Sequence, residues 1–536
     1  MFIFLNTLWL IWEIKYVLFW IYLWQLKDYH LGRFIDHFRT HKGKKLLFSS
    51  TQIFKLISIF VLLLYNNNFF IYFFPIIFLV YLVEFLLVLK SIFSQSIKKP
   101  VRTLKSLFLT IVSFVAVVLF IGWTLNFFDK FQIIMILTFD FLTPVVISVI
   151  VLLFQPIFVA LRGNILKKAG KKLEKIKSLS NLTVIAVTGS YGKTSTKEFL
   201  SKMLSKKFKV LSTKEHQNSE IGIAKCILED LKPSHQIFIA EVGAYNKGKV
   251  KEVCSFLKPK IGVVTGVNEQ HLALFGSLKN LLSAEGGEEL AEALPKNGIL
   301  VVNGDNKYCL NLYKKFNGNK KIYSLSNKVI DSDIWSDSIT VQKGRISFLA
   351  IDKTGELMHF DVKVLGKQNV QNLLGAILIA KELGMNFGEI SEACKNISEE
   401  QAGMTLKHGK HGIDIVDSSY SANPDGVFAD LDYFSIFVNK KVIVMPCLIE
   451  LGKKSSEIHE KIGRKIGEVC DLAIITSKDR FKELKQGAVE AGMDGKNVLL
   501  CDNSQDIYSI ITLFCKSGDA VLLEGRIPAE LINLLE

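Results

Sequence analysis

The stretch Thr188-Gly189-Ser190-Tyr191-Gly192-Lys193-Thr194-Ser195-Thr196 has the composition of a phosphate-binding loop. It follows the apolar run 184–187, which is typical of a buried strand, and precedes Lys197–Leu204, which has a helical pattern. Glycines let backbone N–H groups face a polyphosphate, and the helix N-terminus adds the positive end of its dipole. The common loop has four residues between its first Gly and the Gly-Lys pair, whereas here only two intervene. The layout nevertheless predicts an ATP site where a strand ends and a helix begins.

The side chains of this loop indicate how the nucleotide is held. Lys193 can reach the outer phosphates, and the Thr194 hydroxyl can bind a magnesium ion. ATP and Mg²⁺ are therefore the expected cofactors. The residues expected to surround the phosphates are Gly189, Ser190, Gly192, Lys193, Thr194 and Ser195.

The segment around the loop alternates short β-rich runs with helical stretches, which predicts a parallel sheet covered by helices. The first strand-like runs are 184–187, 236–241, 261–265 and 299–302, and four more follow at 322–325, 338–341, 345–350 and 358–364 before a helical stretch at 370–383. A second α/β pattern runs through 413–416, 442–445, 472–476, 498–501 and 520–524. We expect a central ATP-binding domain over 181–398 and a smaller, Rossmann-like α/β domain over 399–536.

The front of the chain is apolar, in a protein whose hydrophobic content is 49% and mean hydropathy +0.29. A helix needs about 20 apolar residues to cross a bilayer. A cleaved signal peptide fits poorly, because the first apolar run continues past Trp24 and four more follow. We predict an α-helical transmembrane bundle over 1–161 and a basic linker over 162–180. The five apolar stretches are 2–25, 52–66, 69–89, 106–127 and 132–160.

Basic residues gather in alternate loops between these stretches. The positive-inside rule then places the N-terminus outside and everything after Arg162 in the cytoplasm, so the protein is expected to be integral to the cytoplasmic membrane. The loop cations are Lys27, Arg33, Arg39, Lys42, Lys44 and Lys45, then Lys90, Lys98, Lys99, Arg102 and Lys105, and finally Arg162, Lys167, Lys168, Lys171 and Lys172. Inside or near the spans, Glu13, Lys15, Glu84 and Asp140 either line a functional cavity or pair helices.

The net charge of +15 does not indicate a nucleic-acid partner. Much of the excess lies beside the spans, where basic residues attract anionic lipid, and no nucleic-acid motif is present. Membrane lipid is therefore the expected partner of this charge. The eight cysteines are scattered without a CxxC pair, which argues against both a disulfide framework and a zinc site.

Besides the phosphate-binding loop, the chain contains, in order, the stretches His216–Gly222, Glu241–Gly243, Asn268–His271 with Phe275–Ser277, Gly366–Asn369 with Asn372, Asp417–Pro424, and Glu450–Gly452 with His459. Together these stretches resemble those of the Mur ligases, ATP-dependent amide-forming enzymes of cell-wall synthesis. The resemblance covers about 181–536. Several of its elements look most like the branch that adds D-alanyl-D-alanine to UDP-N-acetylmuramoyl-tripeptide.

The resemblance implies a reaction and roles for these residues. ATP phosphorylates a carboxylate, and an amine attacks the acyl phosphate, a chemistry that needs charge neutralisation and positioning. Lys193, Glu241 and His271 would be the catalytic residues. Thr194 and Glu241 would hold one magnesium, and His271 would help hold a second. Asn369 and Asn372 would contact the base, while Asp417, Tyr420 and Asn423 would close onto ATP and substrate from the C-terminal domain.

Three positions depart from the family pattern. Glu285 stands where the family usually carries a carbamylated lysine that steadies the second magnesium, and its carboxylate would supply that anion directly. Ala402-Gly403 replaces the usual Gly-Arg pair, which removes an expected guanidinium. Met445–Ile449 replaces the usual Gly-Asp-Met, in a region that lies near the amino-acid substrate in the family.

The largest departure is that apolar spans replace the family's UDP-binding domain. They either tether a ligase that uses a soluble UDP-linked muramoyl-peptide precursor or hold a lipid-linked form of that precursor. The amine partner would be a dipeptide or an amino acid. Two other interpretations are a ligase that builds a poly-γ-glutamate or a pseudomurein-like peptide, and a non-catalytic ATP-binding membrane scaffold.

Overall fold

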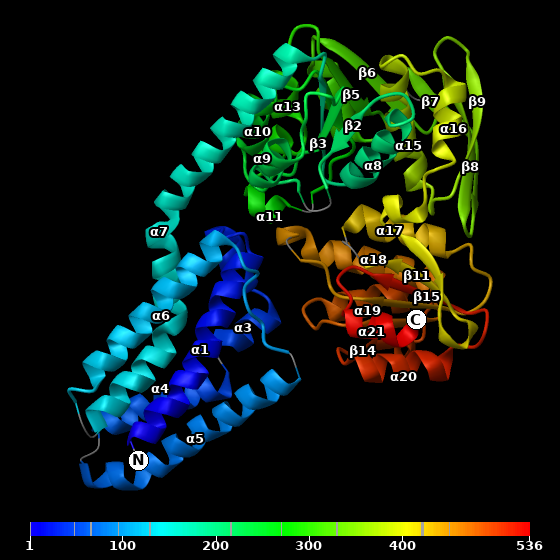
Figure 1. Ribbon diagram of the computed structural model, residues 1–536. Helices are drawn as coiled ribbons and strands as arrows, with labels where there is room; N and C mark the ends of the chain where they lie inside the picture. Colours follow the sequence, from blue (N-terminus) through cyan, green and yellow to red (C-terminus); the bar gives the residue numbers. More distant parts are fainter. Residues whose placement is uncertain are drawn as a thin grey trace. The chain divides into compact units, whose positions relative to one another are not determined.

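The computed structural model describes residues 2–47, 49–64, 67–94, 96–127, 130–214, 217–269, 271–327, 331–419, 423–449 and 451–536. It divides into two compact units, Met1–Gly163 and Asn164–Glu536, called unit 1 and unit 2 below. Unit 1 is helical, and unit 2 contains two β-sheets with their covering helices (Figure 1).

Unit 1 is built from long apolar helices. They are α1 (Phe2–Leu26), α4 (Ser50–Leu64), α5 (Asn67–Phe93), α6 (Leu104–Thr124) and the first part of α7 (Lys130–Leu179), with the short α2 (Leu31–His37) and α3 (His41–Leu47) after α1. Within the described residues, five helical segments are long and apolar enough to cross a membrane. Large apolar side chains face outward along them, including Leu64, Phe93, Leu104, Leu119 and Leu153. This outward apolar surface is the arrangement expected of helices that face lipid.

A charged cluster lies inside unit 1. The Lys55 Nζ atom lies 2.8 Å from both carboxylate oxygens of Glu84 and 2.6 Å from Asp140 Oδ2. The Tyr81 hydroxyl donates a hydrogen bond of 3.1 Å to the same Asp140 oxygen. All four residues are buried. The ionisable residues that the sequence placed near the spans therefore include a buried ion-pair network that connects α4, α5 and α7.

The first sheet of unit 2 has nine strands in the order β2-β3-β1-β4-β5-β6-β7-β8-β9. Neighbouring strands pair in parallel from β2 to β7, whereas β7, β8 and β9 pair antiparallel. The predicted parallel sheet is therefore confirmed, and the strand-like runs after 320 extend its edge. The strands are β1 (Thr183–Thr188), β2 (Val210–Ser212), β3 (Ile237–Glu241), β4 (Ile261–Val264), β5 (Ile299–Asn303), β6 (Asn319–Ser324), β7 (Ile334–Gln342), β8 (Arg345–Asp352) and β9 (Leu357–Val362).

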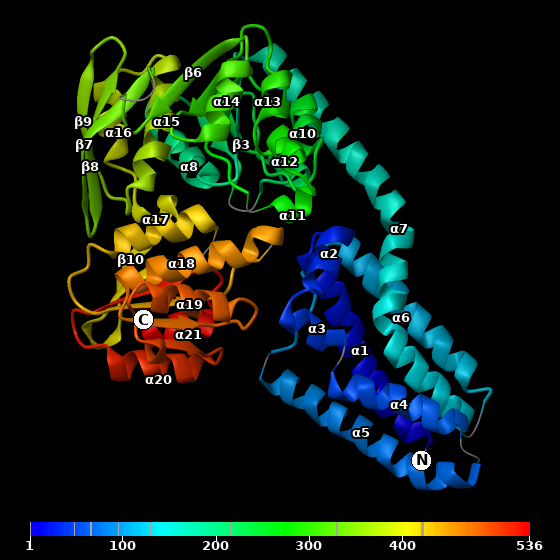
Figure 2. The ribbon, with the colours of Figure 1, turned by 180° about the vertical axis from the view of Figure 1, so that it is seen from behind.

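Helices cover both faces of this sheet (Figures 1 and 2). One face packs against α8 (Lys193–Leu204), α15 (Gln368–Glu382) and α16 (Phe387–Cys394). The other packs against the end of α7 and against α9 (Glu220–Glu229), α10 (Lys249–Leu257), α12 (Leu278–Ala284), α13 (Glu288–Ala293) and α14 (Lys307–Lys315). The strands β1, β3 and β4 are thus buried on both sides, as near-continuous apolar strands require, whereas residues of β8 alternate between buried and more exposed.

The end of α7 is part of the core of unit 2. The stretch expected to be a basic linker is helical as far as Leu179. Lys172 Nζ donates to the Leu228 carbonyl at 2.9 Å, and Lys177 Nζ donates to the Leu257 carbonyl at 3.0 Å. These ammonium groups satisfy carbonyls at the C-terminal ends of α9 and α10, where cations are favoured. The apolar residues of α7 that enter the core are Leu166, Ala169, Leu173 and Ile176.

The second sheet has six strands in the order β10-β11-β15-β12-β13-β14, all parallel except β10. The predicted second α/β pattern is confirmed, and only the short β10 lacked a signal in the sequence. The strands are β10 (Thr405–His408), β11 (Asp414–Ser418), β12 (Lys441–Met445), β13 (Leu472–Ile475), β14 (Val498–Leu500) and β15 (Ala520–Glu524). Their helices are α17 (Pro424–Phe434), α18 (Ser455–Val469), α19 (Phe481–Glu490), α20 (Ser504–Phe514) and α21 (Ala529–Leu535).

Candidate functional site

The phosphate-binding loop joins β1 to α8, and two of its glycines are required by geometry. Gly189 has φ +139° and Gly192 has φ +74°, values that side chains rarely adopt. A Cβ atom at Gly189 would lie 2.5 Å from Thr265 Oγ1, and one at Gly192 would lie 2.5 Å from Asn372 Oδ1. Gly192 also precedes the first turn of α8 without capping that turn through a side chain. The turn therefore presents N–H groups in the way that a polyphosphate needs.

Lys193 is the first residue of α8, and its ammonium group lies over the loop. Its Nζ atom donates to the Gly189 carbonyl at 2.5 Å and to the Ser190 carbonyl at 3.3 Å. Both acceptors belong to the loop itself, so the side chain is folded back on the backbone that would surround the phosphates. Lys193 can exchange these carbonyls for phosphate oxygens, which are stronger acceptors because they are charged.

Glu285 joins the loop to His271. Its Oε1 atom lies 2.8 Å from His271 Nδ1, and its Oε2 atom accepts a hydrogen bond of 2.7 Å from the Ser190 hydroxyl. The side chain is almost fully buried. Burial alone would raise the pKa of Glu285, but His271, Lys193 and Ser190 outweigh that cost and hold the pKa below its ordinary value. The site therefore contains an ionised carboxylate beside the phosphate-binding loop.

Glu241 is the last residue of β3, and its backbone pairs with Val187 next to the loop. Its side chain is buried. Asn218 Nδ2 donates to Glu241 Oε1 at 3.0 Å, and Lys197 Nζ lies 3.5 Å from Glu241 Oε2. The carboxylate is therefore held at both oxygens by protein groups.

The side chains around the phosphate-binding loop offer oxygen and nitrogen ligands for a divalent cation. Among the described residues, no three His, Cys, Asp or Glu side chains come together as a metal site. The available donors are Thr194, Glu241, His271 and the Glu285 carboxylate. This set fits magnesium, which takes one or two carboxylates from the protein and the rest of its ligands from phosphates and water. A softer metal would need a cluster of histidine and cysteine ligands, and none occurs among the residues that the structure describes.

Asn369 and Asn372 lie in α15 and are buried. Asn369 Nδ2 donates to the Leu365 carbonyl at 2.8 Å, and Asn372 Nδ2 donates to Asn369 Oδ1 at 3.0 Å. The Thr196 hydroxyl donates to Asn372 Oδ1 at 3.4 Å, which connects α15 to the helix that follows the phosphate-binding loop. These amides therefore brace α8, and their contact with a nucleotide base stays a prediction.

The loop that contains His271 also contacts the C-terminal domain. Asn268 Nδ2 donates to Asn423 Oδ1 at 3.1 Å and to Asp425 Oδ2 at 2.9 Å. Asn423 is the N-cap of α17, and its Oδ1 atom also accepts from the Gly426 N–H. On its other side, the Asn268 carbonyl lies 3.4 Å from Ser190 Oγ. A short path of polar contacts thus connects the phosphate-binding loop with one predicted C-terminal site residue.

The other C-terminal site residues are placed differently. Asp417 is the penultimate residue of β11, just before Ser418, and its Oδ2 atom lies 2.9 Å from Lys407 Nζ. Burial would raise the pKa of Asp417, but the bonds from Ser419 and Lys407 hold it below its ordinary value. Tyr420 lies outside the described residues, as do His216, Gln270 and Glu450 of the matching stretches.

The structure shows the local conformation at the other two positions that depart from the family pattern. Gly403 has φ +79°, so a left-handed conformation stands where an arginine was expected. After β12, the Cys447 N–H donates to Ser477 Oγ at 2.7 Å, and the Leu448 N–H donates to His459 Nε2 at 2.9 Å. The buried His459 side chain therefore holds the backbone of this segment in place through a hydrogen bond.

Sequence reasoning missed three groups near the site: Lys197, Asn268 as an interdomain contact, and a pair of buried carboxyls. Only Lys197 left a usable signal, because it follows Lys193 by four residues and so lies on the same face of α8. The Asn268–Asn423 contact and the Glu524–Asp430 contact each join residues more than 90 positions apart and leave no local pattern.

The carboxyl pair consists of Glu524, at the end of β15, and Asp430 of α17, both buried. Asp430 Oδ2 accepts from the Ser418 hydroxyl at 2.5 Å, and Asp430 Oδ1 accepts from Gln368 Nε2 at 3.1 Å. Burial and the neighbouring Asp430 raise the pKa of Glu524 well above its ordinary value of 4.5. Burial also raises the pKa of Asp430.

Glu524→Gln is expected to stabilise the protein above about pH 6. Between the ordinary and the raised pKa, folded Glu524 keeps a proton that the unfolded chain has released, so stability falls as pH rises through that window. Glutamine mimics the protonated acid and removes this dependence. We expect the melting temperature of the variant to exceed that of wild type by at least about 2 °C at pH 8, with a smaller gain at pH 5. Exposed Glu530→Gln is the control, and an equal gain at both pH values would contradict the assignment.

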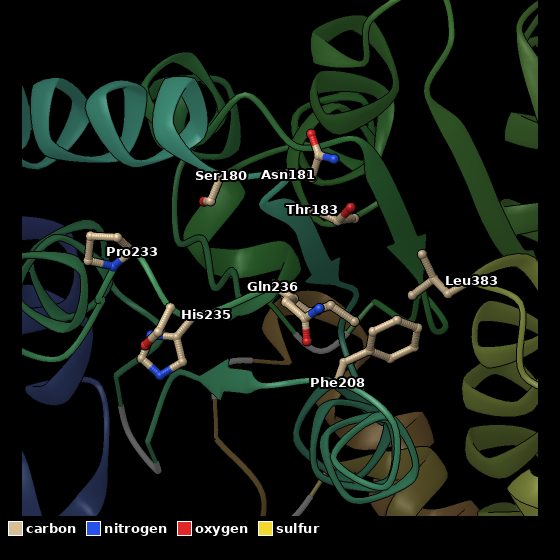
Figure 3. Close-up of a pocket in the computed structure, with 10 residues that line it drawn as sticks. Ser180, Asn181, Thr183, Phe208, Pro233, His235, Gln236 and Leu383 are labelled. Carbon is tan, nitrogen blue, oxygen red and sulfur yellow. The ribbon is translucent and has the colours of Figure 1, made fainter.

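A cavity of about 310 Å³ lies elsewhere in unit 2 (Figure 3). It is lined by Ser180 and Asn181, by Thr183 at the start of β1, and by His235 and Gln236 just before β3. The cavity is therefore at the amino end of these strands, whereas the phosphate-binding loop and Glu241 are at their carboxyl ends. None of the predicted site residues lines it.

Comparisons with known proteins identify the family of this chain. The sequence matches the Mur ligase middle domain over residues 187–380 and the Mur ligase glutamate ligase domain over residues 404–527. It is 29% identical over 280 residues to UDP-N-acetylmuramoyl-tripeptide–D-alanyl-D-alanine ligase of Escherichia coli (strain K12). This alignment covers 52% of this chain and 61% of that relative. The chain thus spans about three fifths of the length of this relative.

Solved structures show the same fold. MurF from Acinetobacter baumannii aligns with a TM-score of 0.62 at 20% identity, over 70% of this chain and 80% of that one. MurF ligase from Thermotoga maritima in complex with ADP aligns with a TM-score of 0.59 at 23% identity, over 70% of this chain and 83% of that one. The two domain matches cover more than half of the chain and contain the phosphate-binding loop, Glu241, His271 and Asn423. This chain belongs to the Mur ligase family.

Proposed function

We propose that this protein is a membrane-anchored, ATP- and magnesium-dependent ligase that adds D-alanyl-D-alanine to a muramoyl-tripeptide in peptidoglycan synthesis. The observation that carries the proposal is the Ser190–Glu285–His271 connection at the phosphate-binding loop, within the matched Mur ligase domains. It brings an ionised carboxylate and a histidine to the place where the loop presents its N–H groups and Lys193. The sequence similarity to a ligase of that specificity supports the choice of substrates.

The phosphoryl-transfer half of the reaction follows from the loop. Loop N–H groups and the N-terminus of α8 would bind the phosphates, and Lys193 would leave its carbonyl partners to contact the outer ones. Thr194, Glu241 and His271 would hold magnesium, with Glu285 supplying a further anion. Bound magnesium supplies charge neutralisation on the transferring group. These groups position and neutralise charge, and no protein nucleophile is required.

The amide-forming half needs the amine to meet the activated carboxylate. The Asn268 contacts with Asn423 and Asp425 already join the His271 loop to the first turn of α17. We propose that Asn423, together with Asp417 and Tyr420, closes this side of the site over ATP and substrate. The role of closure is to exclude water, because water would hydrolyse an acyl phosphate before the amine could attack it.

We further propose that residues 1–161 form a bundle in the cytoplasmic membrane, with the N-terminus outside. The domains over 181–398 and 399–536 would then work in the cytoplasm, connected by the segment 162–180. Support comes from the five long apolar helices, the apolar side chains on their outer surface and the basic residues in alternate loops. The basic loops would contact anionic membrane lipid.

A lipid-linked muramoyl-peptide is the second candidate for the acceptor. The family matches begin at residue 187, and unit 1 precedes them. A carrier lipid held by the apolar helices would bring the peptide to the cytoplasmic domains. The alternative is that unit 1 only tethers the enzyme while the acceptor stays soluble and linked to UDP.

The test measures ADP release by the full-length protein in detergent with magnesium and D-alanyl-D-alanine. One arm adds UDP-linked muramoyl-tripeptide, and the other adds the lipid-linked form. Stimulation by either form together with a new amide product supports the ligase, and the effective form identifies the acceptor. No ADP release with either would contradict the proposed activity and favour another polymer or a non-catalytic scaffold.

A further inference from the structure

Lys197 is a buried cation that none of the roles above uses. It lies one helical turn after Lys193 on α8, and its side chain is fully buried. Its Nζ atom donates to the Thr213 carbonyl at 2.8 Å and lies 2.9 Å from Glu198 Oε1. It also lies 3.5 Å from Glu241 Oε2. A lysine is rarely buried unless its charge is paired, so these contacts account for its position.

The ammonium group compensates the charge of Glu241. A buried carboxylate without an opposite charge nearby is costly, and without Lys197 the Glu241 carboxylate would lose the cation at its Oε2 atom. Lys197 provides the opposite charge at Oε2, while Asn218 provides an amide donor at Oε1. Thr213 fixes the arrangement, because its carbonyl accepts from Lys197 and its Oγ1 atom accepts from the Glu241 N–H. The position of the Lys197 charge relative to Glu241 is therefore set by the backbone.

We propose that Lys197 is a positioning residue that keeps Glu241 from holding a divalent cation by itself, so that the cation enters the site only together with the nucleotide. This inference rests on the proposed function, because it assigns Glu241 to the magnesium site. A cation bound to Glu241 would lie close to the Lys197 ammonium, and in a buried site their repulsion is screened little by water or salt. The phosphates of a bound nucleotide bring the negative charge that offsets this repulsion.

The donor set agrees with this order of binding. In the part of the chain that the structure describes, no group of three acidic, histidine or cysteine side chains is present to attract a free cation. Glu241 approaches the loop from β3, while the His271–Glu285 pair comes from the segment after β4. Each supplies one carboxylate, so the remaining ligands of a divalent cation would be water or phosphate oxygens.

The experiment measures Mn²⁺ binding by the full-length protein in detergent, using the electron paramagnetic resonance signal of free Mn²⁺. Wild type and Lys197→Arg are expected to take up no stoichiometric Mn²⁺ alone and one or more ions per chain once ADP is added. Lys197→Met is expected to bind one Mn²⁺ without nucleotide, with a Kd at least about tenfold lower than in wild type. Adding Glu241→Gln to Lys197→Met should remove that ion, which shows that Glu241 holds it.

Glu198→Gln is the matched control, because Glu198 contacts the same ammonium group but is partly exposed. This variant keeps the Lys197–Glu241 pair and is expected to behave as wild type. The proposal is overturned if wild type binds one Mn²⁺ through Glu241 without nucleotide, or if folded Lys197→Met gains no Mn²⁺ binding. Should Lys197→Met not fold, a wild type that binds one Mn²⁺ without nucleotide and loses it in Glu241→Gln still overturns the proposal.

Nucleotide binding is measured separately by the protection that ADP gives against thermal unfolding. If ADP does not protect the wild-type protein against thermal unfolding, the result contradicts the proposed function. A wild type that binds ADP but also takes up Mn²⁺ alone through Glu241 contradicts only the role of Lys197. The two failures are therefore distinguishable.

Discussion

Lys193→Ala is expected to lower ligase turnover by about 10³-fold or more, the scale seen when a cation or preorganised donor is removed from a charged transition state. The Lys193 side chain donates hydrogen bonds to the Gly189 and Ser190 carbonyls, and it is not fully buried. Folding should therefore change little. The measurement is ADP release with saturating substrates, accompanied by the melting temperature of the same preparation.

Lys202→Ala is the matched control for this prediction. Lys202 lies in the last turn of the same helix and is exposed. Lys202→Ala therefore removes the same charge from α8 as Lys193→Ala does, but at the opposite end of the helix from the loop. We expect it to retain turnover within about twofold, since surface substitutions rarely matter. Near-normal turnover in Lys193→Ala would refute the phosphate-binding role of that residue.

Lys55→Met is expected to destabilise unit 1 by about 3–5 kcal/mol, the cost of breaking a buried ion pair from one side. The substitution keeps the length of the side chain but leaves Glu84 and Asp140 without their shared cation. Thermal unfolding in detergent, followed by tryptophan fluorescence, reports mainly on unit 1. Of the six tryptophans, all but Trp335 lie there: Trp9, Trp12, Trp20, Trp24 and Trp123.

Two further variants test this explanation. Lys55→Met combined with Glu84→Gln and Asp140→Asn removes both orphaned charges and is expected to recover most of the lost stability. Lys15→Met is the control, because Lys15 lies over the Trp12 ring and is only partly buried. A Lys55→Met protein that unfolds at the wild-type temperature, or a triple variant less stable than the single one, would show that the cluster does not hold the helices together.

Much of the architecture was readable in the sequence because it depends on local patterns. The β1–loop–α8 segment carries its glycines and lysine within nine residues, and the positive φ values of Gly189 and Gly192 confirm why glycine is needed there. Strands such as β1, β3 and β4 are nearly continuous apolar runs, which buried parallel strands require. The long apolar helices follow from length and composition alone. The three-residue β2 was too short to produce a pattern.

The boundary between helix and linker was harder to place. Lysines around 167–177 read as a basic connecting segment, yet the apolar residues Leu166, Ala169, Leu173 and Ile176 are spaced as one face of a helix. That face becomes significant only when the sheet of unit 2 is present to cover it. The segment is consequently the end of α7 and part of a core.

The sequence alone indicated the family and the glycine-rich loop between β1 and α8, since these depend on residue type and spacing. The tertiary structure decided which charges meet. Glu285 is shared between Ser190 and His271, Lys197 is paired with Glu241, and Lys55 is enclosed by Glu84 and Asp140. The physical reason is that a buried charge must find its partner in space, and nearly all of these partners come from other strands or helices far away in the chain.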